Sequence, residues 1–427
     1  MVIVDTQLKK LEVAGKPIRI GLVGAGVMGR MIALQLLTPP TGMRLVAIAN
    51  RTPAKAARAF AEGGAAAPAI VVNSVDTLQA AIEAGTPAVT DDPMLLCRAG
   101  NVDAIIEVTG TVEFGATVVL EALRNRKHVI LVNAELDSTL GPILHVYAQR
   151  AGVVITNIDG DEPGVAMTLL RYLQALGLRP VGAGNLKGMI DPYRNPDTQR
   201  DFATKHGQNP FIVTSFADGT KLCMEEAILA NASGFRVGKR GMYGPKCAHV
   251  KEMAKLLPAE QLLNGGLVDY ALGAEPYTGA YVIVYEEHPV KQKHLTHLKM
   301  GDGPFYVFYT PYHLPHVQLS STVARAVLFH DATTAPAAGP MVDVIAIAKK
   351  DLTTGERLDG VGGFTCYGTI DNAPLVREQN LLPMGLAEGC TVVRRLAKDA
   401  PISYADVALP AGRTADRLRA EQSAHFA

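Results

Sequence analysis

IRIGLVGAGVMGRMIALQLL, residues 18–37, is the stretch that decides the fold. A short apolar, partly β-branched run ends in glycines, and apolar residues at helical spacing follow. Between these two predicted elements lies the pattern G-x-G-x-x-G. The first glycine permits a tight turn, the second lets a diphosphate approach the backbone, and the third allows close helix packing. The residues predicted to hold a dinucleotide here, at a helix N-terminus rich in N–H donors, are Gly24, Gly26, Val27, Met28 and Gly29.

The chain that follows alternates between strand-like and helix-like segments up to about residue 160. Strand-like runs are MRLVAIAN, NVDAIIEVTG, RKHVILVN and AGVVITN, with helix-like PAKAARAFAEGG and TVEFGATVVLEALRN among them. Strands and helices that alternate at this length are typical of a parallel sheet. We therefore predict an α/β fold, with a doubly wound Rossmann domain over residues 17–160.

A length of 427 residues exceeds what one hydrophobic core ordinarily supports, so further domains are expected. Mixed helices and strands predict an α+β domain for substrate binding and dimerisation over 161–345. A small β-rich domain is predicted over 346–427. The segments 348–360 and 393–410 are loosely similar, either as related half-units or by chance.

Charge and hydropathy exclude several classes of partner. The 41 basic and 41 acidic residues balance, so neither nucleic acid nor an anionic membrane is expected, and a small-molecule substrate is. No run approaches the length of a membrane span, and the start does not read as a signal peptide, so we expect a cytoplasmic protein. The five cysteines form no C-x-x-C pair, which favours reduced thiols.

The end of the second predicted strand identifies the cofactor. Asn50-Arg51 stands where NAD-specific sites place a carboxylate, so Arg51 predicts a ribose 2′-phosphate and hence NADP(H). A solvated arginine in a turn is the alternative. Thr109-Gly110 and Asn133 end later strands and are predicted to border the nicotinamide, although Asn133 could instead cap a helix.

Residues 185–240 contain the catalytic candidates. Lys187, in apolar NLKGMI, is predicted to be the electrophile, with burial lowering its pKa towards neutrality; a solvated lysine is the alternative. Asp191 follows four residues on. Lys221 and Glu225 share one face of a predicted helix, as an acid/base pair or as a surface pair.

Cationic and polar side chains nearby predict substrate binding: Arg194, Asn195, Lys239 and Arg240. Arginine suits a phosphate group; without a phosphate, Lys239 and Arg240 would be solvated or lie at a subunit contact. His313 and His316 are predicted to be structural rather than metal ligands. A divalent cation, Mg²⁺ or Mn²⁺, held by carboxylates would suit a rearrangement.

Several segments resemble known families. GLVGAGVMG, IIEVTG and KHVILVNAE resemble homoserine dehydrogenase and dihydrodipicolinate reductase. GDEPGVAMTLLRYLQALGL, NLKGMIDPYRNP, TSFADGTK, ANASGFRVGKRGM, FYTPYHLPH, LLPMGLAEGC and DRLRAEQ resemble the 1-deoxy-D-xylulose 5-phosphate reductoisomerase-like (DRL) family. That resemblance implies a homodimer of three-domain chains with a C-terminal SAF-like domain. It also implies NADPH-dependent conversion of 1-deoxy-D-xylulose 5-phosphate to 2-C-methyl-D-erythritol 4-phosphate, a step of isoprenoid biosynthesis.

Three functions therefore stand as hypotheses. The first is that reductoisomerase reaction. The second is a homoserine-dehydrogenase-like NAD(P)-dependent dehydrogenase of a small hydroxy aldehyde, polyol or sugar acid, without rearrangement. The third is a regulatory protein that binds the cofactor but does not consume it.

Overall fold

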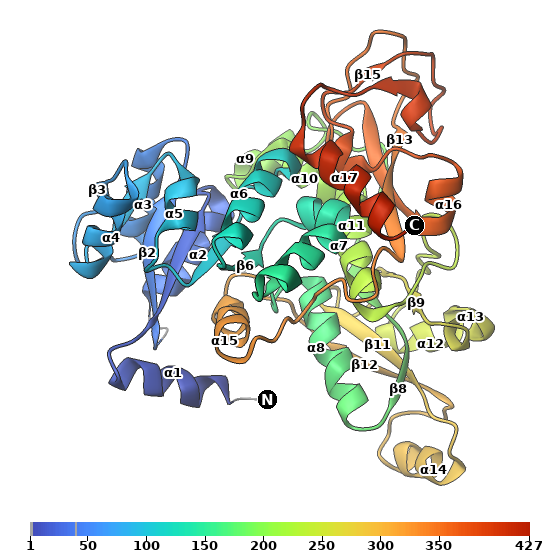
Figure 1. The fold of residues 1–427 in the computed structure, drawn as a ribbon. Helices are drawn as coiled ribbons and strands as arrows, with labels where there is room; N and C mark the ends of the chain where they lie inside the picture. Colours follow the sequence, from blue (N-terminus) through green and yellow to red (C-terminus); the bar gives the residue numbers. More distant parts are fainter. Residues whose placement is uncertain (1–2, 39–40) are drawn as a thin grey trace. The chain divides into compact units, whose positions relative to one another are not determined.

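The computed structural model describes residues 3–38 and 41–427, which form two compact units (Figure 1). The first unit consists of the described residues up to Gly160 together with Leu314–Ala335, and the second of Asp161–His313 together with Pro336–Ala427. The domain bounds expected from the sequence stay predictions.

The first unit is built on a seven-stranded, fully parallel sheet with the order β3-β4-β2-β1-β5-β6-β7. The chain runs outward from β1 in one direction and then, from β5, in the other, so the order reverses between these two strands. Ligands of such sheets bind at this reversal, beyond the carboxyl ends of the strands. The strands are β1 (Ile18–Val23), β2 (Met43–Ala49), β3 (Ile70–Val71), β4 (Ala88–Thr90), β5 (Ala104–Glu107), β6 (His128–Leu131) and β7 (Ile155–Asn157).

Helices cover this sheet and explain why its central strands are buried residue after residue. They are α1 (Val4–Val13), α2 (Val27–Leu37), α3 (Pro53–Glu62), α4 (Val75–Glu83), α5 (Pro93–Arg98), α6 (Val112–Arg124), α7 (Ala134–Ala151) and α15 (Leu319–Phe329). Leu319 and Val323 of α15 pack into the same core as Ile20 and Leu22 of β1. The α/β fold class with a Rossmann sheet is confirmed.

The second unit contains a mixed sheet of order β10-β8-β11-β12, with β9 also paired to β8. Its strands are β8 (Arg179–Lys187), β9 (Leu267–Val268), β10 (Ala271–Leu272), β11 (Ala280–Tyr285) and β12 (Phe305–Thr310). Helices α8 (Glu162–Ala175) and α11 (Thr220–Ser233) pack against β8. The remaining elements of this part are α9 (Arg200–Lys205), α10 (Pro210–Ala217), η1 (Val250–Glu252), α12 (Met253–Leu256), α13 (Ala259–Leu263) and α14 (Pro289–His297).

The last part of the chain adds a small β-rich region to the second unit. β13 (Val342–Ala348) and β14 (Cys366–Asn372) form an antiparallel pair, and α11 packs on both strands. A second antiparallel pair is formed by β15 (Thr391–Val392) and β16 (Val407–Ala408). The other elements are α16 (Ala373–Glu378), η2 (Met384–Leu386), η3 (Tyr404–Asp406) and α17 (Thr414–His425). None of the helices in residues 3–38 and 41–427 has the length and apolar character needed to cross a membrane.

Candidate active site

The glycine turn of the first unit has the geometry of a diphosphate cradle. Gly24 has φ +115°, a conformation that L side chains rarely adopt. A Cβ at Gly29 would lie 2.2 Å from the carbonyl oxygen of Gly24, so only glycine lets α2 come this close to the turn. A Cβ at Gly26 would meet no atom within 4 Å. The open side therefore lies at the N-terminus of α2, where N–H groups and the helix dipole favour an anion.

Asn50 and Arg51, at the end of β2, have different surroundings. Asn50 Oδ1 accepts from the N–H of Ala25 at 3.1 Å, and its Nδ2 donates to the carbonyl of Thr52 at 3.0 Å, so Asn50 holds the glycine turn in place. Arg51 is exposed, and no ion pair involves it within the described chain. Its guanidinium is therefore available to a phosphate group.

A buried carboxylate, which sequence reasoning missed, organises the loop after β5. Glu107 is fully buried; its Oε1 accepts from the N–H of Thr109 at 2.8 Å, and its Oε2 accepts from Asn133 Nδ2 at 2.7 Å. Burial raises the pKa of Glu107. Asn133 Oδ1 also accepts from the N–H of Leu136 at 3.0 Å, so Asn133 caps α7. Gly110 follows Thr109 in this loop. In the sequence, the single charge in the strand run AIIE was the signal that could have pointed to Glu107.

In the second unit, Lys187 ends β8 with its ammonium between two buried carboxylates. Lys187 Nζ donates to Glu162 Oε1 at 2.8 Å and to Glu225 Oε2 at 3.1 Å. Glu162 opens α8, and Glu225 lies in the second turn of α11. The lysine side chain is 19% exposed, and the two glutamates are 7% and 2% exposed. One strand end and two helices thus bring three charges together.

Further polar groups complete this cluster. Carboxylate oxygens of Asp161, Glu162 and Glu225 lie within 4.8 Å of one another. Asn185 Nδ2 donates to Glu225 Oε2 at 3.1 Å. His313 Nδ1 lies 3.7 Å from Glu162 Oε1 and 3.0 Å from Thr278 Oγ1. Of these partners sequence reasoning found only Glu225; the run GDEPG, with two acids at the start of an apolar helix, was the available signal for the others.

Burial and charge set the protonation states in opposite directions. Burial lowers the pKa of Lys187, but the charges of Glu162 and Glu225 outweigh burial, so the pKa is raised above its ordinary value. The expectation of a pKa near neutrality is therefore wrong, because that expectation considered burial without the carboxylates. Burial raises the pKa of Glu162 as well, yet Lys187 and His313 more than reverse that effect and lower it.

The pKa values of the other two carboxyl groups of the cluster, Glu225 and Asp161, are both raised. Burial raises the pKa of Glu225 to about 7, with Glu162 adding to the shift and with Lys187 and Lys221 opposing it. Burial also raises the pKa of Asp161, and Glu162 and Glu225 raise it further. At neutral pH the cluster thus holds a fixed ammonium beside a carboxyl group that gains and loses a proton.

Lys221 and Glu225 lie in α11, and their role as an acid/base pair stays a prediction. Glu225 is buried, and the charge of Lys221 lowers the pKa of both Glu225 and Asp161. A pair on a solvated helix surface would not have a buried member, so the surface alternative is excluded for Glu225.

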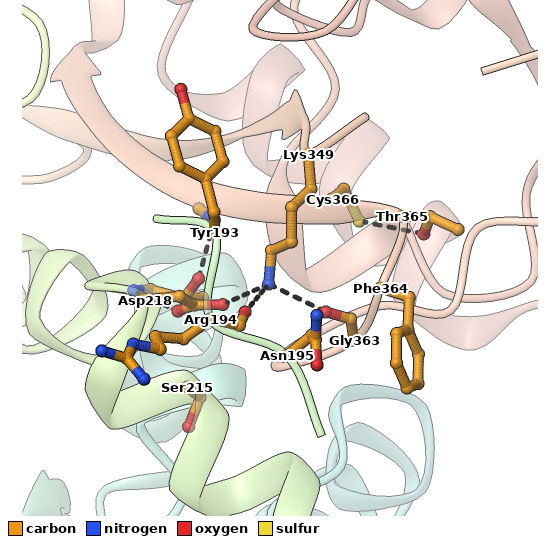
Figure 2. A network of polar contacts seen from close by, with 12 residues as sticks. Tyr193, Arg194, Asn195, Ser215, Asp218, Lys349, Gly363, Phe364, Thr365 and Cys366 are labelled. Atoms are coloured by element: carbon orange, nitrogen blue, oxygen red, sulfur yellow. Dashed lines mark hydrogen bonds and ion pairs between the residues drawn. The ribbon is translucent and has the colours of Figure 1, made fainter. Parts of the chain in front are cut away.

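In the loop after Lys187, the predicted site residues form hydrogen bonds to other residues of the same loop. Arg194 Nε donates to Asp191 Oδ2 at 3.1 Å, so two predicted site residues pair with each other. Asn195 Oδ1 accepts from the N–H groups of Asp197 and Thr198, both at 3.0 Å, and thereby closes a turn. Figure 2 shows that Lys349, which follows β13, donates to the carbonyl oxygen of Arg194. The loop is thus fixed from the β-rich region.

Lys239 and Arg240 also have protein partners. Arg240 Nε donates to Asp371 Oδ2 at 2.7 Å, and Lys239 Nζ lies 5.1 Å from the ring centroid of Tyr243. Among the contacts of the described residues, none joins Arg194, Lys239 and Arg240 to one another. Their convergence on a phosphate stays a prediction.

Two family models match parts of this chain. The family model described as the NAD-binding domain of homoserine dehydrogenase matches residues 21–156, and the model described as the catalytic domain of oxidoreductase DRL matches residues 160–319. The order of these domains defines a nicotinamide-dependent oxidoreductase. Both matches agree with the resemblance to homoserine dehydrogenase and to the DRL family that the sequence segments indicated. No curated protein matches the sequence.

Solved structures share parts of the fold at low sequence identity. A probable dehydrogenase from Thermotoga maritima is 15% identical, with 76% of this chain and 92% of that chain covered and a TM-score of 0.42. Myo-inositol dehydrogenase from Lactobacillus casei in complex with NAD(H) and myo-inositol is 15% identical, with 70% and 75% covered and a TM-score of 0.39. Scyllo-inositol dehydrogenase from the same organism, with NAD(H) and scyllo-inositol, is 14% identical, with 63% and 74% covered and a TM-score of 0.37.

Proposed function

We propose that the protein uses NADP(H) to interconvert a carbonyl and an alcohol on a small polyhydroxylated substrate. The observation that carries this proposal is the partly buried ammonium of Lys187 beside Glu225, a carboxyl group whose pKa is raised to about 7. Hydride transfer to a carbonyl carbon leaves a negative oxygen, which needs a fixed positive charge and a proton.

The roles divide between the two groups. The glycine turn, with Asn50 and Arg51, would hold the nicotinamide cofactor, which in its reduced form would supply the hydride for the carbonyl carbon. Lys187, whose raised pKa keeps it charged, stabilises the alkoxide electrostatically. Glu225 supplies the proton and recovers one from solvent. Asp161, whose pKa burial and the neighbouring carboxylates raise, offers a hydrogen bond to a substrate hydroxyl when it is protonated.

A panel of polyols, aldoses, ketoses, sugar acids and sugar phosphates tests this proposal. Turnover is measured through the absorbance of the reduced nicotinamide in both directions. Consumption of NADPH or reduction of NADP⁺ with at least one compound is expected. Cofactor binding without turnover across the panel would support the regulatory alternative instead.

The preference for NADP(H) rests on Arg51. Replacing it by alanine removes charge-assisted hydrogen bonds to the 2′-phosphate, so NADPH should bind about 10- to 100-fold more weakly. The affinity for NADH, which lacks this phosphate, should stay within about twofold of wild type. Titration followed by nicotinamide fluorescence measures both, and an equal change for the two cofactors would exclude the role of Arg51.

The reductoisomerase reaction is the second candidate, and the three carboxylates of the cluster favour it. Mg²⁺ and Mn²⁺ take oxygen ligands, and a ketol rearrangement needs an electrophile at neighbouring oxygens. However, Lys187 Nζ already contacts Glu162 and Glu225, so these carboxylates fit a divalent cation only if the ammonium leaves. NADPH oxidation that depends on 1-deoxy-D-xylulose 5-phosphate and is inhibited by fosmidomycin would establish this reaction and its place in isoprenoid biosynthesis.

The family resemblance supplies the remaining parts of the proposal. We infer a cytoplasmic homodimer with an SAF-like C-terminal domain. Light scattering of the purified protein tests the dimer, because a monomer would have half the expected mass.

A further inference from the structure

An open cavity of about 480 Å³ lies directly after Lys187 in the second unit. We call it the Lys246 cavity, and the residues that line it include Gly188, Met189, Ile190, Lys246, Cys247 and Leu272. Its apolar side chains leave one charged group on the wall, the ammonium of Lys246. The cavity has no role in the function proposed so far.

Strand register places the side chains of Leu272 and Lys246, which line this cavity, on the same face of the sheet as the Lys187 side chain. In the parallel pair β8 and β10, Leu272 is the partner of Lys187, and Lys246 forms a parallel bridge with Leu272 in turn. Side chains of register partners point to the same face of a sheet. The neighbouring partners Ala271 and Leu186 point to the other face, and both are buried in the hydrophobic core there.

The three residues therefore form a row of lysine, leucine and lysine across adjacent strands. Since neighbouring strands lie about 4.8 Å apart, the Cα atoms of Lys187 and Lys246 are separated by roughly 10 Å. Two lysine side chains that extend in parallel from such a row would hold their ammonium groups at a similar spacing, which a short carbon chain spans. Ile190, which lines the cavity, also lies close to the start of α11, the helix that carries Glu225. A Cβ placed on Gly219, the residue before α11, would be 3.0 Å from Ile190 Cγ2.

The two lysines differ in their partners. Glu162 and Glu225 neutralise Lys187. Lys246 is exposed, and no hydrogen bond or ion pair of its side chain occurs in the described part of the chain. The same holds for the backbone N–H groups of Met189 and Ile190. The cavity is thus lined by a residue with a positive charge and by two residues whose N–H groups have no partner in the described part of the chain, and none of the lining residues is acidic.

We propose that the Lys246 cavity binds the anionic group of the substrate, a carboxylate or a phosphate monoester, while the reacting carbon lies at Lys187. The substrate class is then small polyhydroxylated acids or sugar phosphates. This inference rests on the proposed function for its second part, and it assigns to Lys246 the role that the sequence predicted for Arg194, Lys239 and Arg240.

Cys247 offers a test that does not depend on turnover. It lines the cavity and is half-buried, whereas Cys97, Cys223, Cys366 and Cys390 are buried. Iodoacetamide should therefore modify Cys247 selectively, and the modified peptide can be quantified by mass spectrometry. Burial raises the pKa of the Cys247 thiol, so the reaction is run at about pH 9.

The probes are inorganic phosphate and acetate, each added to the full-length protein during alkylation. In the wild type, at least one anion should slow alkylation of Cys247 by at least about threefold. The Lys246→Ala variant should lose this protection, and Lys246→Arg should keep it. Lys251→Ala removes an exposed lysine outside the cavity and should behave as the wild type.

The outcomes separate the possibilities. Protection by phosphate alone identifies a phosphate monoester, and protection by acetate alone identifies a carboxylate. No protection by either anion, or equal protection in Lys246→Ala, overturns the cavity as an anion site.

Kinetics with a substrate found in the panel complete the test. Lys246→Ala should raise KM for an anionic substrate by about tenfold or more, with kcat within about threefold. An uncharged polyol should be unaffected. Protection without turnover on any compound would support the anion site and overturn the proposed function. Turnover with an unchanged KM in Lys246→Ala would support the proposed function and overturn the anion site.

Discussion

Two lysines of the second unit, the buried Lys349 and the partly buried Lys187, show how similar groups have different roles. Lys349 is 4% exposed and donates to Asp218 Oδ2 at 2.9 Å and to the carbonyl oxygens of Arg194 and Gly363, both at 2.8 Å (Figure 2). Lys187 is 19% exposed and donates to two carboxylates. An ammonium has three N–H donors, so Lys349 uses all of them within the protein and Lys187 uses two.

This difference in the number of N–H donors used shows which of the two lysines is available for chemistry. Lys349 balances one carboxylate and joins three segments of the second unit, so its charge serves the fold. Lys187 keeps one donor for an incoming oxygen, and its surplus of neighbouring carboxylates holds it charged while one of them, Glu225, titrates near neutrality. Predictions for the two lysines therefore separate activity from stability.

The largest expected effect is the loss of turnover in Lys187→Met. Removing a preorganised donor to a developing oxyanion typically costs about 10²- to 10³-fold in kcat, and we expect a loss of that size. Affinity for NADPH should stay unchanged, because the predicted cofactor residues belong to the first unit. Steady-state kinetics and nicotinamide fluorescence measure the two quantities.

Lys187→Ala should behave as the methionine variant does, and Lys187→Arg should retain part of the activity because it keeps the charge. Full turnover in Lys187→Met would show that this lysine is as structural as Lys349, and the contrast between them would fail.

Stability should respond most in Lys349→Met. Leaving Asp218 buried without its partner should lower the free energy of unfolding by about 3–5 kcal/mol, as when one member of a buried ion pair is removed. Turnover of the folded fraction should stay within about threefold of wild type. Urea unfolding and kinetics at low temperature measure these quantities.

A second variant isolates the charge from the packing. Lys349→Met combined with Asp218→Leu removes both charges, and such replacements are often close to neutral, so the double variant should be more stable than Lys349→Met alone. An unchanged unfolding midpoint in Lys349→Met would mean that the pair contributes nothing to the fold.

The sequence predicted well what depends on neighbouring residues. The glycine turn, the alternation of strands and helices, and the shared face of Lys221 and Glu225 are local patterns, and the structure contains each of them. Lys187 stood out because a single charge interrupts an apolar run. These features follow from turn chemistry and helix periodicity alone.

Partners distant in sequence could not be predicted in the same way. The carboxylates that reverse the expected pKa shift of Lys187 lie 25 and 38 residues from it, and Asp371, which pairs with Arg240, lies 131 residues away. A buried acid such as Glu162 looks in the sequence like any surface glutamate. Only tertiary packing decides which charge is desolvated and which meets an opposite charge.

The smallest expected effect is a shift in the pH dependence of the rate. Burial and Glu162 raise the pKa of Glu225 from an ordinary 4.5 to about 7. Since reduction needs protonated Glu225, its rate should fall about tenfold per pH unit above this value. The same shift means that the folded state binds the proton more tightly than the unfolded state. The contribution of Glu225 to stability is therefore full below about pH 4.5 and declines as pH rises towards 7.

The two lysines should differ here as well. Lys187 lowers the pKa of Glu225, so in Lys187→Met the inflection should move upward by about one pH unit. Lys349 is not among the groups that shift this pKa, so Lys349→Met should leave the inflection in place. Glu225→Gln should abolish it. Rate profiles between about pH 5 and 9 measure all three variants against the wild type. An inflection that Lys187→Met does not move would mean that the ammonium and the titrating group are not coupled. The role of proton donor would then pass from Glu225 to another residue of the cluster, such as His313, whose Nδ1 lies 3.7 Å from Glu162 Oε1.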